Sequence, residues 1–136
     1  SDVASQRLAE RHDGADLVAG VDLTGQGDEI ALVLMDMARV ETEPRSRRLA
    51  ELLIAEITAE AGRMNHRPLR SAGFSVLRSP SVPSVLIELG FLSSEKDRAK
   101  IADPEWRTKA ATGIRDAVAL WAAEDAARAE LLRTRP

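Results

Sequence analysis

Apolar positions at helical spacing predict three helices in the first half of the chain. The first covers residues 2–12 and is followed by a loop over 13–27 that is rich in Gly and Asp. A second helix is expected from residue 28 to about residue 40. A third should begin at Pro44, because proline needs no amide donor in a first helical turn, and finish within 62–65. The apolar stripe of this third helix consists of Leu49, Leu52, Leu53, Ile57 and Met64.

The pattern changes beyond residue 72, where two short segments favour extended structure. The first is Gly73-Phe-Ser-Val-Leu-Arg78, which is rich in β-prone residues. The second is Val85-Leu-Ile-Glu-Leu89, an almost continuous apolar run of the kind expected for a strand buried on both faces. Pro80 and Pro83 restrict the loop between them. We therefore expect two strands within residues 72–92.

Helical signals return after the second predicted strand. Ser94 or Ser93 is a suitable cap for a short helix that ends near Ile101. Asp103-Pro104 is a capping residue followed by proline at the first helical position, and it predicts the start of the last helix. The tail of that helix, over 124–133, is rich in Ala, Glu and Arg, so we expect an exposed helical extension there.

The order of elements is helix, helix, helix, strand, strand, helix, helix, which predicts an α/β chain with four segments. They are a first helix with its loop (1–27), two helices (28–65), two strands (72–92) and the C-terminal helices (93–136). Two strands do not make a stable sheet among this many helices. Either absent chain completes the sheet or two copies share strands, so the pattern indicates a fragment of a longer protein.

Composition excludes several classes of function. The 136 residues are 44% hydrophobic and 30% charged, which fits one soluble globular domain. The net charge of -3 comes without the basic stripe of a nucleic-acid-binding protein. No apolar run approaches the roughly 20 residues of a membrane span, and no signal peptide opens the chain. Because cysteine is absent, disulfides, thiolate zinc sites and cysteine nucleophiles are excluded.

Glu88 is the residue that does not fit its surroundings. A carboxylate inside an apolar strand is costly to bury unless it is paired, hydrogen-bonded or bound to a metal. Gly90 permits close approach of a backbone or a ligand. A carboxyl group whose pKa is raised by burial suits general acid–base catalysis. The alternative is a structural ion pair with Arg70 or Arg78, and residue physics alone leaves both interpretations open.

The stretch from Ala72 to Ser93, with Ser84-Val-Leu-Ile-Glu-Leu-Gly-Phe91 near its end, resembles a signature of the zinc-dependent N-acetylmuramoyl-L-alanine amidases. Asp16-Leu-Val-Ala-Gly-Val-Asp22 resembles the cell-division branch of that family in Gram-negative bacteria. The resemblance implies the C-terminal part of a three-layer α/β/α domain. It also implies a periplasmic peptidoglycan hydrolase that cleaves between N-acetylmuramic acid and L-alanine, with Glu88 as a catalytic residue.

Members of this family bind zinc through a His, a Glu and a second His on elements that precede the matching segment. This chain has two histidines, His12 and His66, and neither matches a ligand position. A catalytic zinc ion normally needs three protein ligands and an open position for water. We therefore expect Zn²⁺ in the complete enzyme, none on this fragment alone, and no activity without the missing part. We expect His12 to face solvent and His66 to cap a loop.

The resemblance also implies a means of control. In the cell-division branch, a helix near this place in the chain covers the zinc, and an acidic residue from it occupies the open metal position. If residues 2–12 form that helix, Glu10 is the inhibitory zinc ligand, with Asp13 and Asp16 as alternatives. A LytM-domain activator protein would withdraw the helix, which makes a two-state switch. The other interpretation of Glu10 is a solvated charge.

Two further functions stay open from the sequence. One is a non-catalytic regulatory or protein-interaction module of the same descent. The other is a small helical protein that dimerises through its strands, and it would leave Glu88 without a role.

Overall fold

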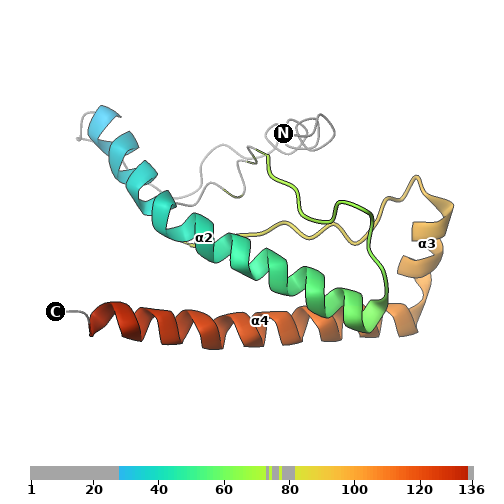
Figure 1. Cartoon of the computed structure of the whole chain (residues 1–136). Helices are drawn as coiled ribbons and strands as arrows, with labels where there is room; N and C mark the ends of the chain where they lie inside the picture. Colours follow the sequence, from blue (N-terminus) through green and yellow to red (C-terminus); the bar gives the residue numbers. More distant parts are fainter. Residues whose placement is uncertain (1–27, 73, 75–76, 78–81, 135–136) are drawn as a thin grey trace. The chain divides into compact units, whose positions relative to one another are not determined.

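The computed structural model describes residues 28–72, 74, 77 and 82–134, with the backbone alone for 28–36 and 38. These residues form three helices: α2 (Asp28–Ala61), α3 (Glu95–Ala102) and α4 (Pro104–Arg133) (Figure 1). The chain divides into two units. One comprises Ser1–Ser46 with Arg70–Val85, and the other comprises Arg47–Leu69 with Leu86–Pro136. The first predicted helix and its loop, over 1–27, lie outside the described residues.

Helix α2 joins two helices that the sequence pattern predicts separately. Pro44 lies inside α2 rather than at the start of a new helix. Proline has no amide hydrogen, so it cannot donate to the carbonyl of Val40 one turn earlier. The helix nevertheless continues through this position, so the prediction of a break before Pro44 is wrong. The helical residues on both sides, with 34 residues in all, outweigh the local penalty of the proline.

The end of α2 agrees with the expected stop. Gly62 has a φ angle of 88°, in the left-handed region that glycine adopts without steric cost. Its N–H donates to the carbonyl of Thr58 at 3.2 Å, which satisfies a carbonyl of the last turn. This is the usual way in which a glycine ends a helix.

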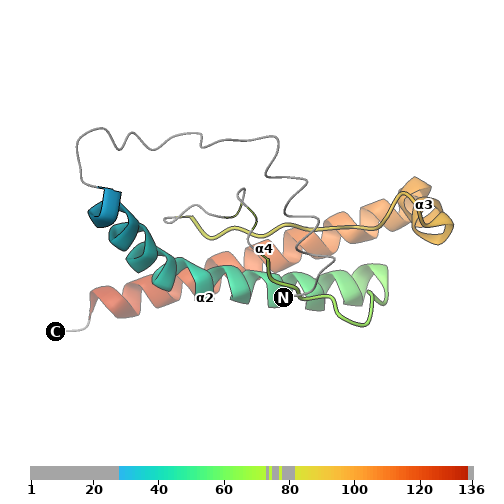
Figure 2. The same cartoon turned by 90° about the horizontal axis from the view of Figure 1, so that it is seen from above.

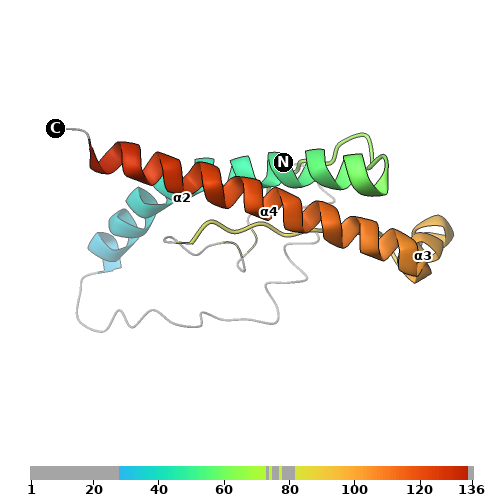
Figure 3. The ribbon, with the colours of Figure 1, turned by 90° about the horizontal axis from the view of Figure 1, so that it is seen from below.

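Within the second unit, α2 from residue 47 onward and α4 run antiparallel, side by side (Figures 1 and 3). The indole Nε1 of Trp106, near the start of α4, donates to the carbonyl of Ala61 at the end of α2. At the other end of the pair, Arg48 of α2 contacts Glu124 of α4. Apolar side chains fill the space between the helices, and the buried ones are Leu49, Leu52, Leu53, Ile57, Ala110 and Ala117. The predicted stripe of the third helix is thus confirmed as core from Leu49 to Ile57.

Helices α3 and α4 meet at a sharp corner (Figure 1), and α3 lies at the start of α4 (Figure 2). Asp103 forms this corner. It ends α3, and its carboxylate accepts the Glu105 N–H at 2.9 Å as the N-cap of α4, with Pro104 in the first turn. The Arg107 guanidinium donates to the carbonyls of Ile101 and Ala102, both at 2.8 Å, which satisfies the C-terminus of α3. The predicted start of the last helix is therefore confirmed.

In the first unit, the hydroxyl groups of Thr42 and Ser46 make hydrogen bonds with backbone groups. Thr42 is buried, and its hydroxyl donates to the carbonyl of Arg39 one turn earlier at 3.4 Å. The backbone N–H of Ser84 donates to the hydroxyl of Ser46 at 2.9 Å, which ties the stretch before residue 86 to α2. None of the described helices is both long enough and apolar enough to cross a membrane.

The predicted α/β class, and with it the three-layer α/β/α arrangement, is wrong for the part of the chain that the structure describes. No strand is present among these residues, and of the first predicted strand, over 73–78, only Phe74 and Leu77 are described. In the first, Leu77 N–H donates to the Phe74 carbonyl three residues back, which is a turn contact and not a ladder contact. In the second, residues 85–89 belong to neither a helix nor a strand. A strand exists only where a second backbone pairs with it, and an apolar run by itself does not supply that partner.

Candidate functional site

Glu88 lies in an irregular segment that leads into α3. Its side chain is exposed, so the expectation of a carboxylate buried inside a strand is not met in this structure. Arg78, one of the two alternative ion-pair partners, is outside the described residues. Arg70, the other, belongs to a different unit of the chain. The structural ion pair therefore stays a prediction, as does the catalytic role.

Large apolar side chains flank the carboxylate and are also exposed. Leu86 is 39% exposed and Leu89 is 45% exposed, and the values rise to 54% at Phe91 and 73% at Leu92. Exposed apolar patches often mark surfaces that are covered by a ligand or by another protein.

Helix α3 holds the chain immediately after Glu88. The backbone N–H of Phe91 donates to Oδ2 of Asp97 at 3.1 Å. A Cβ atom on Gly90 would lie 2.9 Å from the Cβ of Asp97 and 3.2 Å from Cδ1 of Ile101, so only glycine fits against α3 here. The two contacts together fix the backbone two and three residues beyond Glu88.

The first turn of α3 is itself well ordered by side-chain contacts. Ser94 is its N-cap, as expected, and its hydroxyl accepts the N–H of Asp97 at 3.3 Å. The Arg98 guanidinium reaches back to the carbonyl of Leu92 at 2.7 Å. The segment that carries Glu88 is therefore held at its C-terminal end by hydrogen bonds to the Asp97 and Arg98 side chains of α3.

The predicted metal and inhibitory residues are not brought together. Among the residues with described side chains, no three of His, Cys, Asp or Glu form a group that could hold a metal ion. His12, Glu10, Asp13 and Asp16 lie outside the described residues, so their assignments stay predictions.

His66 is exposed and lies in the bend after α2. The capping group in that bend is its neighbour, since Oδ1 of Asn65 accepts the N–H of Arg67 at 2.8 Å. Among the described residues, no hydrogen bond assigns the expected capping role to His66 itself.

One feature that sequence reasoning missed is an open cleft of about 360 Å³ where the end of α2 meets the start of α4. Its lining includes the carboxylates of Glu60, Asp103 and Glu105 and the Lys109 ammonium. The hydrogen bond from Lys109 to Glu105, 2.6 Å long, is the main cause that raises the pKa of Lys109. Asp103 is the N-cap of α4, and Lys109 forms the ion pair with Glu105, so both residues have a structural role. The sequence predicts the end of α2 and the start of α4, but no pattern in it predicts that these two helix ends lie side by side.

Comparison with known proteins places these residues in a family. The family model described as N-acetylmuramoyl-L-alanine amidase matches residues 12–119, which include Glu88 and the whole of α3.

Individual relatives agree with this match. The chain is 32% identical over 118 residues to N-acetylmuramoyl-L-alanine amidase AmiA of Escherichia coli strain K12, a match that covers 87% of this chain and 40% of that protein. It is 32% identical to N-acetylmuramoyl-L-alanine amidase AmiC of Neisseria meningitidis over 85% of this chain and 27% of that protein. It is 34% identical to N-acetylmuramoyl-L-alanine amidase LytC of Bacillus subtilis over 52% of this chain and 14% of that protein.

The chain spans less than half the length of each of these relatives. No solved structure matches it. The family match nevertheless covers well over half of the chain and contains the segment around Glu88. The chain therefore belongs to the N-acetylmuramoyl-L-alanine amidase family.

Proposed function

We propose that the complete protein is a peptidoglycan hydrolase that cleaves the amide bond between N-acetylmuramic acid and L-alanine, with Glu88 as its general acid and base. The observation that supports this most is the family match over 12–119. Within that range, Glu88 is an exposed carboxylate on a segment whose end is tied to α3.

The chemistry of the reaction needs a group of this kind. Water must lose a proton as it attacks the amide carbonyl, and the departing amine of L-alanine must gain one before the C–N bond breaks. A carboxylate that reaches both positions accepts the first proton and donates it at the second. The exposed apolar side chains of Leu86 and Leu89 would pack against bound substrate and exclude water around the carboxylate.

Zinc belongs to this proposal through the family alone. The described side chains do not fit a zinc ion, because no three candidate ligands come together among them. We propose that the ligands of the complete enzyme lie elsewhere in the protein. Metal analysis should then find about one equivalent of zinc in the complete protein and none on residues 1–136 alone. Stoichiometric zinc on the short chain would contradict this assignment.

The site of action follows from the substrate. Peptidoglycan lies outside the cytoplasmic membrane, so we propose a periplasmic location and a role in cell division. We also propose that a LytM-domain activator protein controls the enzyme. Glu10 would hold the open metal position until the activator withdraws it, with Asp13 and Asp16 as alternative blocking residues.

The inhibitory role of Glu10 predicts a gain of function. Glu10→Ala in the complete protein should raise amidase activity measured without activator by about tenfold or more, because a blocked metal position becomes open to water. Asp13→Ala and Asp16→Ala serve as matched controls. Unchanged basal activity for Glu10→Ala would rule out this residue as the inhibitor, and a rise confined to one control would transfer the role to that residue.

The proposed cleavage is tested by product analysis. The complete protein, with its activator, is incubated with purified peptidoglycan, and the soluble products are separated and sequenced. Amidase action releases stem peptides with a free amino group on L-alanine and leaves the glycan strands intact. Products with new reducing sugar ends, or peptides cut within the stem, would instead identify a hydrolase of another specificity.

A further inference from the structure

Asp97 makes a contact that a helix cap does not require. We propose that Asp97 is a positioning residue for Glu88, which it holds in place through the backbone N–H of Phe91. This inference rests on the proposed function, because it assigns Asp97 a part in the same reaction. It adds a residue outside the Glu88 segment, on helix α3, that controls how the carboxylate is presented.

The Asp97 side chain points away from the usual partner of an acidic residue at its position. An acidic residue at this third helical position usually reaches back to the N–H of the N-cap residue. Here the N–H of the N-cap, Ser94, instead donates to the carbonyl of Phe91 at 2.9 Å. The Asp97 carboxylate reaches past the cap and accepts the N–H of Phe91 at 3.1 Å.

Asp97 is itself held in place by the cap of α3. Its own N–H donates to the Ser94 hydroxyl at 3.3 Å, which fixes the start of its side chain. A negative charge in the first turn of a helix is also favoured by the helix dipole. An acceptor that is already oriented loses little freedom when it binds a backbone group, so it makes an effective anchor.

The anchored residue Phe91 lies close to Glu88 along the chain. Phe91 is three residues beyond Glu88, so at most about 10 Å of backbone separates the anchor from the carboxylate. The close packing of Gly90 against the Cβ of Asp97 adds a second restraint between them. Loss of the hydrogen bond releases the backbone at Phe91, and a displacement of roughly 1 Å costs a catalytic group about a hundredfold in rate.

The experiment uses the complete protein and four variants. Asp97→Ala removes the acceptor, and Asp97→Asn keeps an oxygen in the same place. Asp103→Ala is the matched control, because the carboxylate of this aspartate caps the next helix, α4, through the N–H of Glu105. Glu88→Gln tests the proposed function itself. For each variant, kcat, KM and the thermal unfolding midpoint are measured with soluble peptidoglycan fragments.

We expect Asp97→Ala to lower kcat by about 10- to 100-fold while KM stays within about a factor of two, since substrate still binds but the carboxylate is displaced. Asp97→Asn should retain kcat within about threefold of the unmodified protein, because its amide oxygen accepts the Phe91 N–H. Asp103→Ala should lower the unfolding midpoint as much as Asp97→Ala does and leave kcat unchanged.

Two results would overturn the proposal. If Asp97→Ala loses stability but keeps its kcat, as Asp103→Ala should, Asp97 is a structural cap only. If Asp97→Asn falls as far as Asp97→Ala, the hydrogen bond to Phe91 is not what matters. An active Glu88→Gln variant would be a failure of the proposed function and not of the anchor, so the two failures are distinguishable.

Discussion

Gly113 shows at the scale of one residue what sets the distance between α2 and α4. A Cβ atom on this glycine would lie 2.8 Å from the carbonyl oxygen of Glu56 and from the Cα of Ile57. Both neighbours are backbone atoms, so no side chain can rotate away to make room. Ala110 and Ala117, one turn before and one turn after, are also buried, and these small residues let the helices approach closely.

Gly113→Ala should therefore destabilise the fold by about 1–3 kcal/mol, the usual cost of overpacking. Alanine is the better helix former by about 1 kcal/mol, but that gain is smaller than the cost of separating two helices. Chemical denaturation of the chain measures the change. Ala111→Gly, at an exposed position of the same helix, is the control, and it should cost about 1 kcal/mol from helix propensity alone. A Gly113→Ala variant that is more stable than the unmodified chain would contradict the close approach of α2 and α4 at Gly113.

At the scale of elements, the sequence predicts where helices end and which helix face is buried. It predicts less well whether a helix continues through a proline and whether a strand finds a partner. Ser94, Asp103 and Gly62 end or begin their helices as expected, because caps depend on residues a few positions apart. The strand predicted over 85–89 is absent, because apolar content reports the tendency to be buried and not the presence of a partner strand. The hydrogen bond between Asp97 and Phe91 could not be predicted, because the sequence shows only an acidic residue near the start of a helix.

Pro44 gives a second prediction at this scale. Because α2 continues through the proline, the position already has helical geometry, and Pro44→Ala would restore an amide donor to the carbonyl of Val40. The substitution should raise the free energy of unfolding by about 1–3 kcal/mol, with more helical signal in far-ultraviolet circular dichroism. A loss of stability instead would mean that the helix breaks at Pro44 in solution.

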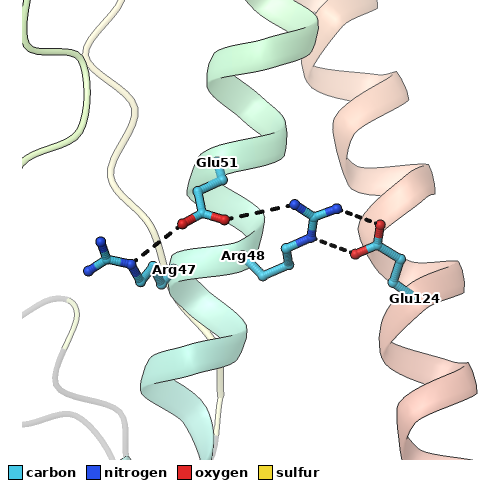
Figure 4. Close-up of polar contacts among 4 residues, drawn as sticks. All are labelled: Arg47, Arg48, Glu51 and Glu124. Carbon is cyan, nitrogen blue, oxygen red and sulfur yellow. Dashed lines mark hydrogen bonds and ion pairs between the residues drawn. The ribbon is translucent and has the colours of Figure 1, made fainter.

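At the scale of the whole second unit, one ion-pair network joins α2 to α4 (Figure 4). The Arg48 guanidinium donates two hydrogen bonds of 2.7 Å to the carboxylate of Glu124. Its Nη1 also lies 3.8 Å from Oε2 of Glu51. Oε1 of Glu51 in turn lies 3.5 Å from Nε of Arg47. The hydrogen bond from Arg48 is the main cause that lowers the pKa of Glu124. The charged form of Glu124 is therefore favoured in the folded state.

This lowered pKa predicts a pH dependence of stability. The network contributes fully above the ordinary glutamate pKa of about 4.3, and its contribution is lost as the pH falls through the lower pKa of the folded state. Glu124→Gln should thus be less stable than the unmodified chain at neutral pH, and the difference should shrink in acid. Denaturation at a series of pH values measures it. A difference that stays constant into acid would show that the pair adds nothing through charge.

The central claim, that Glu88 carries out proton transfer in an amidase, is tested most directly by the kcat of Glu88→Gln in the complete protein. Glu95→Gln, at another exposed glutamate seven residues further on, is the control. Glutamine keeps the size of the side chain but cannot accept and return a proton. This catalytic role predicts that kcat for release of stem peptides falls by about 10²- to 10⁴-fold in Glu88→Gln and is unchanged in Glu95→Gln. A Glu88→Gln enzyme that retains kcat within about threefold of the unmodified protein would contradict it.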